Sequence, residues 1–168
     1  MKKSNYLLAV AMLFIAGTAF SQSPIAKGQN QLNLGVGLSG WGVPFYVGID
    51  HGVHPDITVG GELSYRAYRE NYKKEYYNHS ILGVSGNANY HFNSVLNIPS
   101  DWDLYAGLNI GFYNWSSPNN YYGDHTSGLG LGGQVGGRYY LNNKVGLNLE
   151  FGGGNAFSGG KFGLSVKL

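Results

Sequence analysis

The sequence predicts an all-β protein, an eight-stranded antiparallel up-and-down transmembrane β-barrel preceded by a cleavable signal peptide. Apolar residues alternate with small or polar ones along most of the chain, which is the two-residue period of a strand with two different faces. Charged residues make up only 12% of the chain, about half the usual share, while it holds 28 glycines and 14 tyrosines. Such a composition suits strands with one face in lipid and the other in a crowded interior.

The N-terminal segment has the features of a secretory signal. Two lysines supply the positive start, an apolar stretch covers residues 6–16, and a small-x-small cleavage site ends at Ser21 before Gln22. The apolar stretch is shorter than the roughly 20 residues that a membrane-spanning helix needs, which argues against an uncleaved anchor. We therefore expect a signal peptide over residues 1–21 and a single mature domain over residues 22–168.

Each expected strand carries aliphatic or aromatic residues on one face and polar residues or glycine on the other. In the first strand, for example, Leu32, Leu34 and Val36 alternate with Asn33 and Gly35. Most of the strands approach the roughly nine to eleven residues that cross a bilayer at a tilt. The eight strands are expected at 31–38, 45–50, 57–66, 82–92, 104–113, 129–141, 145–151 and 161–168.

The connections between these strands alternate in character. Compact turns are expected at 52–56 and 142–144, and long polar loops at 69–78 and 114–127. Short turns at one end and longer loops at the other are typical of outer-membrane barrels, whose turns lie in the periplasm. Closure of the sheet is required, because an open edge in lipid would leave backbone groups without hydrogen bonds.

The abundant glycines have a role in such a barrel. An eight-stranded barrel is just wide enough for side chains to fill its interior. Large inward residues such as Tyr46 and Tyr105 therefore need small neighbours, which Gly35 and Gly107 supply.

Two segments carry a resemblance to a known family. The hairpin over residues 138–147, RYYLNNKVGL, and the closing strand over residues 163–168, GLSVKL, resemble the outer-membrane protein β-barrel domain family. The resemblance covers roughly residues 29–168, and small OmpA/OmpX-type eight-stranded barrels are the architectural comparison. It implies a location in the outer membrane of a Gram-negative bacterium, among outer-membrane lipids and lipopolysaccharide, after insertion by the barrel-assembly machinery. The chain departs from the family pattern at Leu168, where such barrels often end in Phe or Trp.

Charged residues on the inward face form the most informative constellation. The alternation places Glu62, Arg66, Arg138, Glu150 and Lys161 in the lumen, and Lys167 with them. Unpaired charge in a narrow lumen is costly, so we predict a paired network among these residues. The register of the 142–144 turn sets Glu150 one diagonal step from Arg138, within reach of a long side chain. Structural filling of a plugged lumen is the favoured interpretation, and a gated polar path is the alternative.

The two long loops are rich in tyrosine and asparagine, residues that make adaptable contact surfaces on a rigid scaffold. Binding of a surface ligand or of lipopolysaccharide is one interpretation, and a simply solvated loop is the other. The candidate contact residues are Tyr72, Tyr76, Tyr77, Trp115, Tyr121 and Tyr122.

One turn contains residue types that could bind a metal. His51 and His54, in a turn with Asp50 and Asp56, have donor types that hold metals. A polar periplasmic turn is the favoured explanation, so no metal site is predicted. The net charge of +2 gives no case for a nucleic-acid partner, and no cofactor is expected.

The sequence also allows a serine hydrolase arrangement, in which Asp124 and His125 lie near Ser116, Ser117 and Ser127. Loops of this composition contain such residues by chance, so no catalytic residues are predicted.

The favoured function is therefore a non-catalytic integral outer-membrane barrel with a filled lumen and a structural or surface-interaction role. A membrane-embedded lipid-modifying enzyme, dependent on His125 or Ser127, is one alternative. An exported soluble lipocalin-like barrel is the other, and it would require an apolar interior and a polar exterior.

Overall fold

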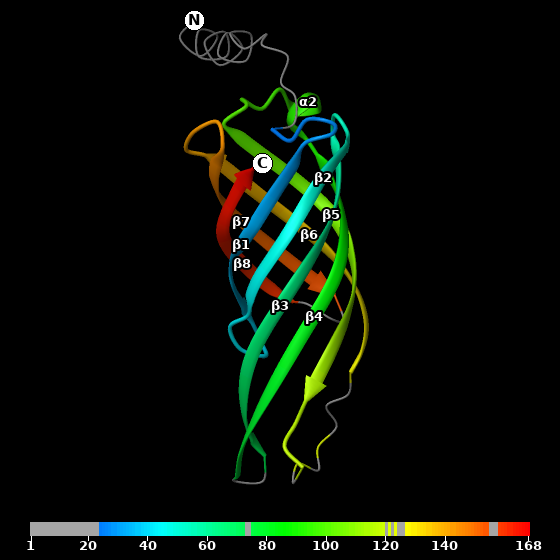
Figure 1. Ribbon diagram of the computed structural model, residues 1–168, viewed down its shortest axis with the longest axis vertical. Helices are drawn as coiled ribbons and strands as arrows, with labels where there is room; N and C mark the ends of the chain where they lie inside the picture. The colour runs from blue at the N-terminus through cyan, green and yellow to red at the C-terminus, as the bar shows by residue number, and fades with distance from the viewer. Residues whose placement is uncertain (1–23, 73–74, 120, 122, 124–126, 155–157) are drawn as a thin grey trace, which may run out of the picture.

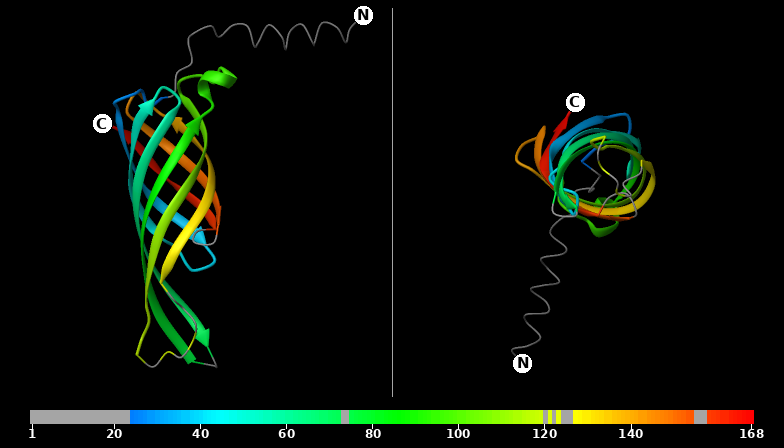
Figure 2. Two further views of the ribbon diagram at one scale, coloured as in Figure 1. Left: turned by 90° about the vertical axis from the view of Figure 1, so that its right-hand side faces the viewer. Right: turned by 90° about the horizontal axis from the view of Figure 1, so that it is seen from below.

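The computed structural model of the protein describes residues 24–72, 75–119, 121, 123, 127–154 and 158–168 (Figure 1). Within them, eight antiparallel strands pair in sequence order, and the first strand pairs with the last to close a barrel. The end view in Figure 2 shows the strands as a ring. The strands are β1 (Asn30–Ser39), β2 (Phe45–His54), β3 (Ile57–Tyr72), β4 (Glu75–His91), β5 (Trp102–Ser116), β6 (Gly128–Tyr140), β7 (Val145–Gly154) and β8 (Gly159–Lys167).

The two faces of the strands differ as the alternation predicts. Leu34, Val47 and Leu108 point outward, and Leu108 is 73% exposed. Arg138 points inward and is only 2% exposed. Many other polar residues are buried in the same way. A soluble barrel would bury its leucines and expose its arginines, so this inverted arrangement fits an exterior in lipid. The predicted fold class is confirmed, and the lipocalin-like alternative is wrong.

The two ends of the barrel are unlike each other. One end, which we call the turn end, carries the start of β1, the C-terminus, the β2–β3 and β6–β7 turns and the short helix α2 (Asn93–Leu96) (Figure 1). No helix in the described ranges is long and apolar enough to cross a membrane. The opposite end, which we call the loop end, carries the β1–β2, β3–β4, β5–β6 and β7–β8 connections.

The loop end is extended by the β3–β4 hairpin, which projects far beyond the neighbouring strands together with the end of β5 (Figures 1 and 2). The prediction of a polar loop at 69–78 is wrong, because β3 and β4 stay paired as far as Tyr72 and Glu75. The outward face changes there from rings such as Tyr65 to polar residues such as Arg69 and Asn78. The hairpin therefore continues the strand pairing into water, above the apolar belt.

The turn end is covered in part by the segment that precedes β1. Pro24 and Ile25 are buried, and Ile25 is 1% exposed. Gly28 donates its N–H to the carbonyl of Gly52 at 2.7 Å, which ties this segment to β2. The sequence alone gave no indication of this cover, because the segment lacks a strand or helix pattern.

Candidate functional site

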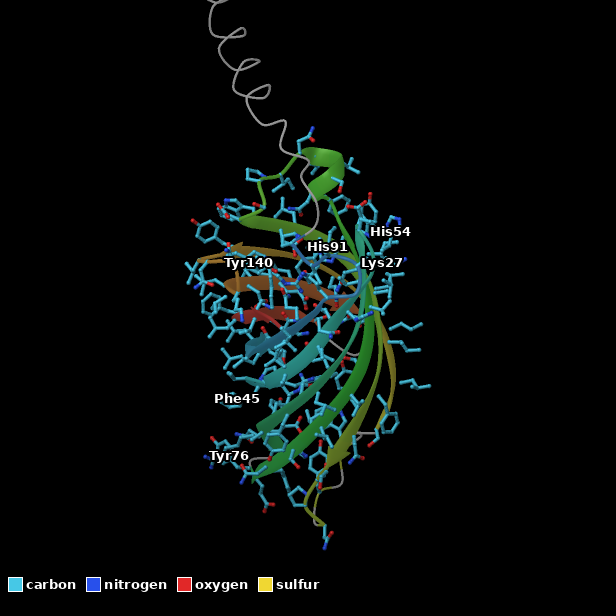
Figure 3. All side chains as sticks on the ribbon, turned by 45° about the horizontal axis from the view of Figure 1, so that its top comes forward. Lys27, Phe45, His54, Tyr76, His91 and Tyr140 are labelled. Atoms are coloured by element: carbon cyan, nitrogen blue, oxygen red, sulfur yellow. The ribbon has the colours of Figure 1, made fainter. Side chains whose placement is uncertain are left out.

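The lumen holds its charged side chains in layers, and the layer nearest the turn end is centred on Arg138. The guanidinium Nη2 of Arg138 lies 2.8 Å from Asp50 Oδ2, and Nη1 lies 2.9 Å from Asp103 Oδ2. Asp103 Oδ1 is also bonded to His91 Nδ1 at 2.7 Å, and His91 Nε2 lies 3.0 Å from Thr58 Oγ1. All five residues are almost completely buried. This turn-end layer therefore joins paired charges from β2, β5 and β6 to the hydrogen-bonded Thr58 of β3 and His91 of β4, of which His91 is labelled in Figure 3.

The middle layer is centred on Lys161. Its Nζ lies 2.8 Å from both carboxylate oxygens of Glu62 and 3.2 Å from Glu150 Oε1. Tyr105 donates its hydroxyl to the other oxygen of Glu150 at 2.9 Å, and the ring of Tyr46 lies 5.2 Å from Lys161 Nζ. A lysine from β8 and two carboxylates from β3 and β7 therefore meet across the lumen.

The loop-end layer contains Arg66 without a carboxylate. Arg66 Nη1 donates to Ser39 Oγ at 3.0 Å. Its guanidinium carbon lies 5.9 Å from the ring of Trp41 and 5.7 Å from the ring of Tyr113. The arginine is only 1% exposed, and its guanidinium faces aromatic rings in place of a carboxylate.

The structure brings together only part of the charge network expected from the sequence. Glu62, Glu150 and Lys161 lie together in the structure, whereas Arg138 pairs with Asp50 and Asp103 in place of Glu150. Asp103 lies directly opposite Arg138 in the β5–β6 register, but it precedes the expected start of its strand. An expected strand that began one residue earlier would have identified this partner. Lys167 instead lies near the turn end, with its Nζ 3.8 Å from the ring of Tyr140.

Polar side chains fill the space between the charged layers. Gln134 donates to Asn89 at 2.7 Å and accepts from Asn109 at 2.9 Å. The described cavities in the lumen have room for little more than a single water molecule each. Polar side chains therefore occupy much of the described lumen between the charged layers.

An aromatic cap covers the loop end of the lumen. We define it as Trp41, Tyr68, His79, Trp115 and Tyr121, with rings from the β1–β2 connection, β3, β4, β5 and the β5–β6 connection. Trp41 and Trp115 meet edge to face at 5.2 Å between centroids, and His79 meets Tyr121 at 4.6 Å. Such edge contacts are favourable between rings, so the cap fixes the projecting hairpin against the β1–β2 and β5–β6 connections.

The candidate contact residues divide between the cap and the surface. Tyr77 is buried, 5.1 Å from the ring of Tyr121, and Trp115 and Tyr121 are half-buried members of the cap. Tyr76 is 62% exposed and lies 4.4 Å from the guanidinium of Arg69 on the outward face of the hairpin. The side chain of Tyr72 and the whole of Tyr122 lie outside the described residues.

A serine, a histidine and a carboxylate also meet in the cap, although they are not the residues expected from the sequence. His79 Nδ1 lies 2.8 Å from Ser117 Oγ, and His79 Nε2 lies 3.6 Å from Glu70 Oε2. The imidazole is fully buried, so a substrate could reach it only by displacing cap residues such as Tyr121. The arrangement therefore suits a hydrogen-bonded support within the cap better than a nucleophile with its base.

The other groups considered for chemistry lie partly outside the described residues. Asp124 and His125 lie outside the described residues, and Ser127 Oγ accepts from the Trp115 N–H at 3.0 Å. Among the residues that the structure describes, no His, Asp and Glu side chains gather as metal ligands would.

Comparison with known proteins gives one family and several similar structures. A family model described as the outer membrane protein beta-barrel domain matches residues 7–167. No curated protein matches the chain.

The similar structures share the barrel at low sequence identity. OprG of Pseudomonas aeruginosa is 10% identical, over 87% of this chain and 99% of its own, with a TM-score of 0.64. Neisserial surface protein A is 14% identical, over 83% and 94%, with a TM-score of 0.54. Ail of Yersinia pestis, solved in a phospholipid bilayer nanodisc, is 11% identical, over 84% and 100%, with a TM-score of 0.53. At these identities the likeness shows the fold alone.

Proposed function

The chain belongs to the outer membrane protein beta-barrel domain family and lies in the Gram-negative outer membrane, and on this premise we propose a non-catalytic surface role for it. In this proposal the lumen is filled, and the projecting β3–β4 hairpin makes the contacts. The turn end faces the periplasm and the loop end faces the cell exterior, as is usual for such barrels. Residues 1–21 are removed on export, and the barrel-assembly machinery inserts the mature chain.

A filled lumen is supported by the charged layers. Arg138 with its two aspartates and Lys161 with its two glutamates cross the lumen at different depths. An ion passing through would have to break both groups, and each is held by short hydrogen bonds in a low-dielectric interior. Eight strands also leave no space for an aqueous channel beside these side chains.

The filled lumen predicts a result in planar lipid bilayers. Insertion of the purified protein is expected to give no steady conductance steps above the bare membrane, because both charged layers remain paired at neutral pH. A sixteen-stranded porin added to the same bilayer is the positive control. Regular steps from the wild-type protein would contradict the filled lumen.

The hairpin is the single observation that carries the surface role. It keeps strand geometry beyond the apolar belt and is fixed by the aromatic cap, so it presents a rigid surface. Its outward face offers Arg69 stacked on exposed Tyr76, together with Asn78. The phosphates and core sugars of lipopolysaccharide lie just above the apolar belt of the outer leaflet. A cation held on an aromatic face, beside amides, suits those groups.

We expect lipopolysaccharide to stabilise the barrel through this face. In vesicles of phosphatidylcholine with added lipopolysaccharide, the thermal midpoint of wild-type unfolding should rise above that in phosphatidylcholine alone. For the Arg69→Gln/Tyr76→Ser variant the rise should be about 2–4 °C smaller, because roughly 1 kcal/mol of interaction with the anionic surface is lost. The shift in gel mobility between folded and boiled protein reports the midpoint.

Lys144→Gln is the matched control, since Lys144 is an exposed cation in the β6–β7 turn at the opposite end. This variant should keep the full effect of lipopolysaccharide. An equal rise in wild type and in the hairpin variant would count against the hairpin as the contact surface.

A further inference from the structure

We propose that the lumen binds one small monatomic anion, of the halide class, beside Arg66. This site goes beyond the proposed surface role and does not depend on it. The anion would lie between the aromatic cap and the middle layer, in the cavity that Arg66 lines.

Arg66 is a buried cation with unused donor capacity. Its side chain is 1% exposed, its Nη1 bonds only to Ser39 Oγ, and its Nε is buried without a hydrogen-bond partner. No described carboxylate lies within ion-pair distance of its guanidinium. Buried polar atoms are almost always satisfied, so an orphaned arginine N–H points to an occupant such as a water or an ion. An uncompensated charge in this setting is costly, which favours an anion over a neutral water.

The neighbouring charges do not remove this need. Glu62 lines the same cavity, but both of its oxygens lie 2.8 Å from Lys161 Nζ. Arg138 also has a buried Nε without a partner, yet its charge is balanced by Asp50 and Asp103. Arg66 therefore differs from Arg138 and Lys161 in lacking a carboxylate within ion-pair distance.

The cavity offers further donors and a defined size. Ser64, Ser85 and Tyr113 place hydroxyl-bearing side chains around it, while Asn109 Nδ2 already donates to Gln134 and Asn87 has a buried Oδ1 without a partner. Hydroxyl groups can donate to an anion that a single guanidinium cannot enclose. The free space accommodates one particle close to the size of water. Chloride and bromide are larger than water and enter only if the lining side chains shift slightly, whereas sulfate is far too large, so the site should select by size.

The test uses crystals of the folded wild-type protein grown in sodium bromide. Anomalous diffraction is expected to show a bromide peak within hydrogen-bond distance of the Arg66 guanidinium. The peak should be absent from Arg66→Gln crystals and retained in Lys144→Gln crystals, which lose an exposed cation of the same charge. Ordinary water density beside Arg66 in wild-type bromide crystals, with no anomalous peak, would overturn the proposal.

A solution measurement covers the case in which Arg66→Gln fails to crystallise or to fold. In detergent, replacing sodium sulfate by sodium chloride at equal ionic strength should change the wild-type and Lys144→Gln thermal midpoints alike. The Arg66→Lys variant keeps the charge but loses the planar fork, and its response to chloride should be at least halved. An identical response of wild type and Arg66→Lys would contradict an anion held by the guanidinium.

Discussion

Replacing Arg138 with methionine is expected to destabilise the barrel by about 3–5 kcal/mol, among the largest effects of any single substitution in this chain. The methionine fills much of the same volume but leaves Asp50 and Asp103 buried without their cation. Each aspartate is at most 2% exposed, so water cannot replace the lost guanidinium. Urea unfolding of the protein in lipid vesicles, followed by tryptophan fluorescence, measures the change in the free energy of unfolding.

The same measurement on a triple variant separates lost charge pairing from lost packing. Arg138→Met combined with Asp50→Asn and Asp103→Asn removes all three charges, and it should recover most of the lost stability. Arg69→Met, at the exposed arginine of the hairpin, should change stability by no more than about 0.5 kcal/mol. If Arg138→Met alone proved as stable as Arg69→Met, the turn-end layer would not be a stabilising group of paired charges.

Gly35→Val is expected to prevent closure of the barrel, at a cost of about 3 kcal/mol or more. Gly35 of β1 lies opposite Gly163 of β8 in the strand pair that closes the ring. A Cβ at Gly35 would lie 2.2 Å from the carbonyl oxygen of Phe162 and 2.6 Å from the Cα of Gly163. Both are backbone atoms, so they can move away only if β1 and β8 separate. The fraction of protein that migrates as the compact form before boiling should fall sharply.

Gly61→Ala provides the comparison, because Gly61 is also a strand glycine but faces outward. Its added Cβ would lie 3.6 Å from the nearest atom, the carbonyl oxygen of Ser85, which is an ordinary contact. Its stability should remain within about 0.5 kcal/mol of wild type. A Gly35→Val protein with the wild-type compact fraction would show that the β1–β8 pair tolerates a side chain.

The alternation along the sequence was sufficient to predict which residues face lipid and which face the lumen. Leu108 and Arg138 illustrate this, since the two-residue period alone places them on opposite faces. The alternation could not predict that Arg138 pairs with Asp50. Asp50 is 88 residues away in the sequence, and its approach depends on the stagger of the strands around the ring, which no local pattern contains.

The candidate contact surface was predicted less well, and the reason is also physical. Tyrosines in a polar segment were expected to lie on a loop surface, but Tyr77 turns inward because the strand pairing continues through the hairpin. Tyr76, one residue earlier, turns outward by the same alternation. The two-residue period therefore extended further than the change in polarity suggested, because water and not lipid surrounds the hairpin.

The pairing of the first strand with the last sets the order in which this protein can be completed. Ser165 of β8 donates its hydroxyl to Asn33 of β1, across 132 residues of sequence. Until the final residues are made, β1 therefore has an edge with no neighbour, and the growing sheet has another at its newest strand. Neither edge is tolerated in the hydrocarbon layer. Strand β1 thus gains its second neighbour last, and the sheet can lie wholly in the hydrocarbon layer only once β8 has paired with it.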